Sequence, residues 1–193
     1  RFAEGTLLGL GALVILGFSY YLLRGPLAQA PSRVAFLVTG VLYCGLLLTS
    51  LSGLKAKENG LGWILLALAI TWLNDTGAYA AGRLFGKHKL YPKVSPGKTW
   101  EGLAGGTLAS VGAAFAVKAL MLPELSWAGC LAVALPCSVL GPLGDLSESM
   151  LKRAYEVKDS GWLIPGHGGL LDRVDAALFT LPYVWLYATL ALG

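Results

Sequence analysis

The chain has 193 residues, of which 55% are hydrophobic and only 13% are charged, with a formal net charge of +4. Soluble domains average about 25% charged residues, so this composition excludes an ordinary soluble protein and indicates one that is largely dissolved in lipid. The length fits a single domain, and the sequence predicts an all-α polytopic membrane protein.

Six apolar segments are long enough to cross a bilayer, which takes about 20 residues. They are expected at residues 6–23, 34–54, 61–82, 99–122, 127–143 and 170–192. The first has no short apolar core followed by a small-residue cleavage site, so it is interpreted as a span and not as a signal peptide. Residues 1–60 are thus predicted to form two N-terminal transmembrane helices. Residues 61–193 are predicted to form a catalytic membrane domain, with four transmembrane helices and two polar loops at 83–98 and 145–170.

The distribution of basic residues predicts the orientation. If the six helices alternate in direction, the loops at 24–33, 83–98 and 145–173 share one side of the membrane and carry eleven of the 15 Lys and Arg residues. The positive-inside rule places that side in the cytoplasm. Every candidate chemical motif falls on this side, so the sequence predicts a polar site at the cytoplasmic face.

Asp75 is the first candidate, because an ionisable residue within a membrane-spanning helix is costly and marks a functional hypothesis. Asp75, Tyr79, Gly82 and Arg83 recur at helical spacing and are expected on one face. A carboxylate that only hydrogen-bonds between helices remains the alternative.

The segment SPGKTWEG, residues 95–102, is the second candidate. Ser95 is predicted to cap a helix whose first residue is Pro96, which would place Lys98 at a helix N-terminus, where phosphate groups bind. A Walker A loop is rejected because Pro92 stands where that motif needs glycine and because no strand precedes it. A basic loop that merely attracts anionic lipid remains the alternative.

Residues 145–175 are the third candidate and contain six of the eleven acidic residues. Asp145, Glu148, Ser149 and Lys152 are spaced to share one face of a short helix. Further along, the sequence has acidic residues at 172 and 175 behind a glycine-rich turn. Carboxylates of this kind suit Mg²⁺, which also takes substrate phosphates as ligands, and the nearby Lys and Arg side chains could neutralise those phosphates. A solvated loop with neutralising ion pairs remains the alternative.

These motifs together resemble the phosphatidate cytidylyltransferases, also called CDP-diacylglycerol synthases. The resemblance rests on Ser149-x-x-Lys152-Arg153, Lys158-Asp159, Pro165-Gly166-His167-Gly168-Gly169 and Asp172-Arg173-x-Asp175, and extends to 74–79 and 95–102. It covers roughly residues 70 to 190. Bacterial members of that family usually have more N-terminal helices than the two expected here before residue 61.

The resemblance implies transfer of a cytidylyl group from CTP to phosphatidate in a bacterial inner membrane, with no role for nucleic acid. It also implies Mg²⁺, a second cation such as K⁺, membrane lipids as partners, and a homodimer. Because the attacking phosphate is already ionised, positioning and charge stabilisation are expected to be the main catalytic effects.

The side chains predicted to carry this chemistry fall into three sets. The predicted catalytic residues are Lys98, Asp145, Lys152, Asp172 and Arg173. The predicted substrate-binding residues are Asn74, Tyr79, Ser95, Lys98, Thr99, Ser149, Lys152, Arg153, Lys158, His167, Gly168, Gly169 and Arg173. The predicted metal ligands are Asp145 and Asp172, with support from Asp75, Glu101, Glu148 and Asp175.

Two other functions stay open. A cytidylyltransferase for a different lipid phosphate, such as an isoprenoid one, would need the same polar residues. An ion-coupled transporter could use Asp75, Asp145 and Asp172 as an ion path, although the carboxylates gather at one face and no inverted repeat is visible. A CDP-alcohol phosphotransferase is excluded because its Asp-x-x-Asp-Gly-x-x-Ala-Arg signature is absent from the sequence.

Overall fold

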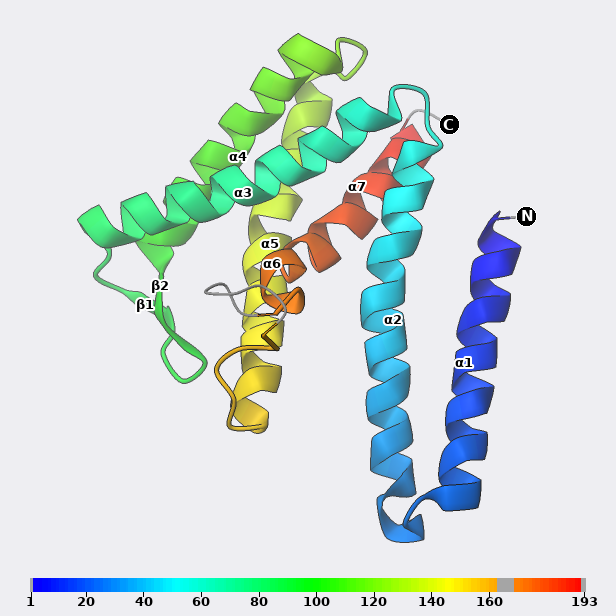
Figure 1. Ribbon diagram of the computed structural model, residues 1–193. Coiled ribbons are helices and arrows are strands. Elements are labelled where there is room, and N and C mark those ends of the chain that lie inside the picture. The colour runs from blue at the N-terminus through cyan, green and yellow to red at the C-terminus, as the bar shows by residue number, and fades with distance from the viewer. Residues whose placement is uncertain (1, 163–168, 192–193) are drawn as a thin grey trace.

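The computed structural model describes residues 2–162 and 169–191, and these residues form an all-α polytopic membrane protein with one small hairpin (Figure 1). The helices are α1 (Phe2–Arg24), the short η1 (Leu27–Gln29), α2 (Ala30–Lys55), α3 (Gly60–Phe85), α4 (Trp100–Met121), α5 (Trp127–Ala154), α6 (Leu171–Val174) and α7 (Ala177–Ala191). The strands are β1 (Lys89–Tyr91) and β2 (Ser95–Thr99). The predicted residues His167 and Gly168 lie outside the described ranges.

The predicted apolar segments are mostly helical over the described residues. Four described helical segments are long and apolar enough to cross a membrane: Leu27–Lys55, Gly60–Phe85, Trp100–Met121 and Trp127–Ala154. Leu8–Arg24 and Ala177–Ala191 are shorter apolar helices, so they account for the first and sixth predicted spans. The prediction of about six membrane helices is therefore supported.

Helix α3 pairs with α4 through small residues. A Cβ added to Gly77 on α3 would lie 2.6 Å from the Cβ of Ala109 on α4, and one added to Gly106 would lie 2.9 Å from the backbone oxygen of Asn74. Such close approach is typical of membrane helices, where van der Waals packing replaces the hydrophobic effect between helices. The pairing brings the polar end of α3 against the start of α4.

Helices α5 and α7 complete the core behind this pair. Buried side chains from the four helices meet there, among them Trp63, Ile70, Val133 and Val184. Helix α2 packs on α7 and α3, and α1 packs on α2, so the two N-terminal helices stand to one side of the bundle (Figure 1). Leu54 of α2 also belongs to this core, and the predicted division of the chain at residue 60 stays a prediction.

The fifth helix is longer than predicted. Residues 145–154 were expected to belong to a polar loop containing a separate short helix, but α5 runs unbroken from Trp127 to Ala154. Pro142 cannot donate a backbone hydrogen bond to Ser138, yet the side chain of Asn74 donates to that carbonyl at 3.2 Å. Likewise, Pro136 leaves the carbonyl of Ala132 free, and the hydroxyl of Tyr183 donates to it at 2.8 Å. Side chains from α3 and α7 therefore replace the hydrogen bonds that the two prolines remove.

The start of α4 also differs from the prediction. Ser95 does not cap a helix, and Pro96 does not begin one, because Ser95–Thr99 forms strand β2 and pairs antiparallel with β1. Pro92 follows Tyr91 in a turn closed by the hydrogen bond from the Val94 amide to the Tyr91 carbonyl. Thr99 is the real cap, and its hydroxyl accepts a hydrogen bond from the amide of Gly102 at 3.1 Å. Lys98 therefore projects from a strand.

The last predicted helix is broken in two. Asp172 lies in α6 and Asp175 follows it, before α7 begins at Ala177. Gly144 of α5 faces this break, since a Cβ there would lie 2.5 Å from the carbonyl oxygen of Asp175. The two acidic residues therefore do not share the opening turns of one long helix, as had been predicted.

The connections that were predicted to share one side lie at the same end of the molecule. The turn between α1 and α2, the hairpin and the C-terminal end of α5 point towards the lower part of Figure 1, whereas the α2–α3 and α4–α5 connections lie in the upper part. This arrangement agrees with helices that alternate in direction.

Candidate active site

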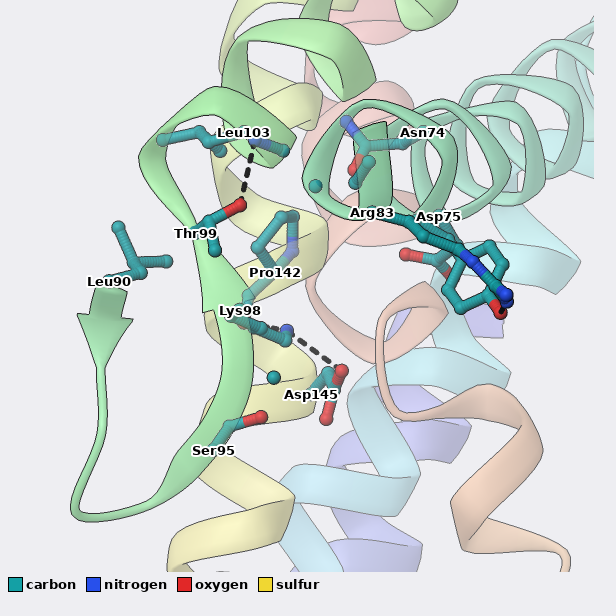
Figure 2. A pocket seen from close by; sticks show the side chains of 15 residues that line it. Asn74, Asp75, Arg83, Leu90, Ser95, Lys98, Thr99, Leu103, Pro142 and Asp145 are labelled. Carbon is teal, nitrogen blue, oxygen red and sulfur yellow. Dashed lines mark hydrogen bonds and ion pairs between the residues drawn. The ribbon is translucent and has the colours of Figure 1, made fainter. Parts of the chain in front are cut away.

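Three separate stretches of sequence meet around one cavity of about 420 Å³ (Figure 2). One wall comes from α3, the second from the hairpin and the start of α4, and the third from α5. Its described lining residues are Asn74, Asp75, Ala78, Tyr79, Gly82, Arg83, Leu90, Ser95, Gly97, Lys98, Thr99, Gly102, Leu103, Pro142 and Asp145. Of the predicted stretch 145–175, Asp145 lines this cavity, so the cavity joins a part of each of the three candidate stretches, and their role as a common site stays a prediction.

The α3 wall carries the residues that were expected on one face. Asp75, Tyr79, Gly82 and Arg83 all line the cavity. The guanidinium of Arg83 donates a hydrogen bond to the hydroxyl of Tyr79 at 2.9 Å, so Tyr79 fixes its direction.

Asn74 connects this wall to the rest of the bundle. It is 1% exposed, and its amide nitrogen donates to the Ser110 hydroxyl at 2.9 Å and to the Ser138 carbonyl. Within the described part of the chain its Oδ1 has no hydrogen-bond partner. Buried polar atoms are usually satisfied, so this oxygen is a candidate acceptor for a ligand group.

The hairpin brings Lys98 to α5. Its ammonium lies 2.7 Å from Oδ2 of Asp145 and 3.2 Å from the carbonyl oxygen of Pro142. The Ser149 hydroxyl donates to the other oxygen of Asp145 at 3.2 Å. Asp145 and Asp75 are the carboxylates among the described lining residues, and Lys98 and Arg83 are the cations, so the lining has balanced formal charge.

Lys152 is the centre of a second charged group, one to two turns further along α5. Its ammonium lies 2.5 Å from Glu148 and 2.6 Å from Oδ1 of Asp172, and the Glu148 side chain is only 1% exposed. Oε1 of Glu148 has no hydrogen-bond partner among the described residues. One partly buried cation therefore holds two carboxylates from different elements together.

Asp172 also organises the loop that follows α5. Its Oδ2 accepts hydrogen bonds from the amide of Ser160 at 2.9 Å, the hydroxyl of Ser160 at 2.7 Å and the amide of Gly169 at 2.7 Å. Burial alone would raise the pKa of Asp172, but these hydrogen bonds and the one from Lys152 outweigh it and hold the pKa well below its usual range. Asp172 is thus a charged anchor with both oxygens engaged.

Asp175 lies in a different electrostatic environment. Burial raises its pKa to about 7, and the negative charges of Asp145, Glu148 and Asp75 act in the same direction, while the hydrogen bond from the Ala176 amide opposes them. The carboxylates of Asp75, Asp145 and Glu148 thus lie close enough to Asp175 to raise its pKa. A bound cation would relieve their repulsion.

The other predicted residues lie around the cavity rather than in it. Glu101 is engaged with the base of the hairpin, where its carboxylate lies 2.6 Å from Nδ1 of His88 and accepts from the His88 amide. Three basic side chains are exposed: Arg153 in the last turn of α5, Lys158 beyond the end of α5, and Arg173 on α6. Gly169 is buried beside Ser160. Their predicted roles in binding metal or substrate stay predictions.

Some residues of the site were missed by sequence reasoning. Arg83 was placed on the α3 face but was not predicted to bind substrate, although its spacing from Tyr79 was a usable signal. Ser160, which holds Asp172, and Pro142, whose carbonyl accepts from Lys98, were not singled out. These contacts join residues distant in sequence, so no local pattern marks them.

A family model described as the cytidylyltransferase family matches residues 2–191. The chain belongs to the cytidylyltransferase family. Among its relatives, the phosphatidate cytidylyltransferase of Staphylococcus epidermidis is 48% identical over 128 residues, which cover 66% of this chain and 49% of the relative. The phosphatidate cytidylyltransferase of Bacillus subtilis is 41% identical over 161 residues, which cover 83% of this chain and 59% of the relative. That of Staphylococcus aureus is 47% identical over 128 residues, covering 66% and 49%.

The resemblance inferred from the motifs is confirmed by this membership of the cytidylyltransferase family. The chain spans about half the length of the curated relatives it matches.

Proposed function

We propose that this chain forms the catalytic part of an integral membrane enzyme that transfers CMP from CTP to phosphatidate, giving CDP-diacylglycerol and pyrophosphate. The observation that carries the proposal is the meeting of Asp75, Lys98 and Asp145 in one cavity within a chain of the cytidylyltransferase family. The relatives are phosphatidate cytidylyltransferases, which supports phosphatidate as the lipid substrate.

The reaction is a displacement at phosphorus. A phosphate oxygen of phosphatidate attacks the α-phosphorus of CTP, and the bond from that phosphorus to the oxygen bridging it to the β-phosphate breaks. The phosphate monoester is already ionised near neutral pH, so the attacking oxygen needs no general base. The main barrier is the approach of two anions, which preorganised positive charge lowers.

Lys98 is the side chain best placed to supply that charge within the cavity. Its ammonium is held at the hairpin by Asp145 and the Pro142 carbonyl, so its position is set before substrate arrives. A triphosphate in the cavity would compete with Asp145 for this ammonium. Lys152 acts differently, because it keeps Glu148 and Asp172 in place behind the cavity.

The cavity offers two carboxylates to a Mg²⁺ ion, which would need its remaining ligands from water and substrate. Mg²⁺ is usually held by one or two carboxylates together with waters and substrate phosphates, and Asp75 and Asp145 both line the cavity. The described residues contain no group of three or more His, Cys, Asp or Glu side chains close enough to hold a metal without substrate. When bound, Mg²⁺ would neutralise phosphate charge. Asp175 and Glu148 would support such a site through their charge, whereas the oxygens of Asp172 are already engaged.

We further propose that the site faces the cytoplasm of a bacterial inner membrane. The basic connections lie at the end of the molecule that contains the cavity, and the relatives are bacterial. CTP would then reach the cavity from water while phosphatidate keeps its acyl chains in lipid. A homodimer and a second cation such as K⁺ stay predictions.

The test is an assay of the purified protein in detergent with CTP, phosphatidate and Mg²⁺. We expect equal amounts of pyrophosphate and CDP-diacylglycerol, and no product when the metal is chelated. An isoprenyl phosphate offered instead of phosphatidate separates the two lipid classes, since turnover of it alone would favour the alternative cytidylyltransferase. Absence of metal-dependent CTP binding would contradict the enzymatic function as a whole.

A further inference from the structure

One face of α3 is exposed although the helix belongs to the packed pair with α4. Trp72, Thr76, Tyr79 and Arg83 recur at intervals of four, three and four residues, which places them in a single row along the helix. All four are exposed, with Trp72 at 61% and Tyr79 at 68%. We call this row the α3 stripe.

The α3 stripe changes from apolar to cationic along its length. Helix α3 is apolar enough to span the membrane, so its exposed apolar side chains, such as Trp72, are expected to face lipid. The hydroxyl of Thr76 donates to the backbone oxygen of Trp72, which removes it as a free polar group. The stripe then reaches Tyr79 and Arg83 in the last turns, where both also line the cavity. It therefore leads from the lipid-facing surface into the candidate active site.

Arg83 has free capacity to bind an anion. Within the described residues Arg83 donates a hydrogen bond to the Tyr79 hydroxyl, and no carboxylate forms an ion pair with it. A guanidinium has five N–H donors, so several remain available. Lys98, the other cation that lines the cavity, is already paired with Asp145.

We propose that Arg83, held in direction by Tyr79, binds the phosphate monoester of the lipid substrate at the mouth of the cavity, with the acyl chains lying along the α3 stripe. This inference rests on the proposed function and assigns the lipid phosphate to the α3 wall and the nucleotide to the wall that carries Lys98 (Figure 2). The charge suits a phosphate monoester, because its three terminal oxygens carry more than one negative charge and fit the planar fork of arginine. A phosphodiester lipid offers less charge and fewer oxygens.

The first experiment compares apparent KM values in mixed micelles. For Arg83→Ala we expect the KM for phosphatidate to rise about tenfold or more, as expected for loss of a charged hydrogen-bonding group. The KM for CTP should stay within about twofold. Arg83→Lys should lie between wild type and Arg83→Ala, because lysine keeps the charge but loses the fork. Tyr79→Phe should raise the KM for phosphatidate by less than Arg83→Ala does.

The control is Lys87→Ala. Lys87 is an exposed basic residue four positions along the chain that does not line the cavity, so its loss tests unspecific attraction to anionic lipid. We expect both KM values of this variant to match wild type. A rise in the KM for phosphatidate equal to that of Arg83→Ala would overturn the proposal.

A second experiment needs no catalysis. Thermal unfolding in detergent is followed with added short-chain phosphatidate or phosphatidylglycerol and without CTP. We expect phosphatidate to stabilise the wild type more than the diester does, and Arg83→Ala to abolish the difference. Equal stabilisation by both lipids, or an unchanged difference in Arg83→Ala, would overturn the proposal. If phosphatidate binding depends on Arg83 but the protein forms no CDP-diacylglycerol, the proposed function is refuted and the assignment of the lipid phosphate to Arg83 remains.

A third experiment tests whether lipid or a second copy of the chain covers the α3 stripe. If Trp72→Ala changed the oligomeric mass in light scattering and left the KM for phosphatidate unaltered, a second copy of the chain would cover the α3 stripe. That result would overturn the lipid assignment.

Discussion

Two lysine side chains of this protein hold carboxylates from other positions of the chain. Lys98 pairs with Asp145 at the cavity, and Lys152 pairs with Glu148 and Asp172 further along α5. The group around Lys152 has little solvent access, so removing one partner leaves a charge in a poorly solvated place and is costly. The Lys98–Asp145 pair is more exposed to solvent, so its loss should cost little stability and should instead change the chemistry of the cavity.

Asp145→Asn should lower kcat by about a hundredfold or more, a loss typical of removing a group that organises charge at the reacting centre. The side chain keeps its shape and its hydrogen bond from Ser149, so the thermal unfolding temperature should change little. CDP-diacylglycerol formation at saturating CTP and phosphatidate measures the effect. Glu156→Gln, an exposed carboxylate beyond the end of α5, is the matched control and should retain wild-type turnover. Near-normal turnover in Asp145→Asn would refute its role.

Lys152→Met should instead destabilise the fold. It leaves the carboxylates of Glu148 and Asp172 without their common cation, which costs about 3 kcal/mol when a buried pair loses one partner. Thermal unfolding in detergent would show a lowered midpoint, and adding Glu148→Gln to Lys152→Met should recover part of it. The exposed neighbour Arg153→Met should leave the midpoint unchanged. An unaltered midpoint in Lys152→Met would mean that the three groups do not depend on one another.

At the scale of elements, α5 shows how a proline-containing helix stays continuous in a membrane. Pro136 and Pro142 each remove one backbone donor, and Tyr183 and Asn74 supply donors from neighbouring helices. The same contacts tie α5 to α7 and to α3. Because α5 is continuous, Asp145 and Lys152 lie on the same helix. The distance between the cavity and the ion pairs of Lys152 is therefore fixed by that helix.

Tyr183→Phe should cost about 1 kcal/mol, the usual net value of one hydrogen bond, because the Ala132 carbonyl loses its donor. In a Pro136→Ala background the backbone amide at 136 can bond to Ala132, so the same change should cost less. Thermal unfolding of the four proteins in this double-mutant cycle measures the coupling. Strictly additive effects would show that Tyr183 does not compensate for Pro136.

At the scale of the whole molecule, the polar chemistry gathers at one end of an apolar bundle. The hairpin and the C-terminal end of α5 lie there, and the opposite end carries the α2–α3 and α4–α5 connections (Figure 1). The proposed reaction joins a nucleotide that arrives from water to a lipid that stays in the membrane. A polar site at one end of an apolar bundle can be reached by both.

Cysteine labelling tests the orientation of this end. Cys44 is exposed whereas Cys130 and Cys137 are buried, so Cys44→Ala provides a low-labelling background. In this background Lys158→Cys should react with a membrane-impermeant thiol reagent in inside-out vesicles, and Glu58→Cys should react in intact cells. Reaction of Lys158→Cys from outside the cell would reverse the proposed topology.

The sequence by itself determined the membrane class, the six apolar helices and the family, because these depend on composition, segment length and residues close together in the chain. It also predicted that the ends of alternating helices share one side, and Asp75, Lys98 and Asp145 do line one cavity, while their roles stay predictions. The local structure around the prolines was predicted less well. The helix expected from Ser95 is a strand, and the break expected after residue 143 is a continuous helix.

Only the tertiary structure decided these points, because the deciding hydrogen bonds come from distant residues. Asn74 lies 64 residues from the carbonyl that it satisfies in α5, and the pairing of β1 with β2 extends the backbone as far as Thr99. The same holds for the site, where Lys98 meets an acid from another helix and Arg83 reaches both the cavity and the lipid-facing α3 stripe. Spacing along one helix predicts which side chains share a face, but the partners of that face depend on how the helices pack.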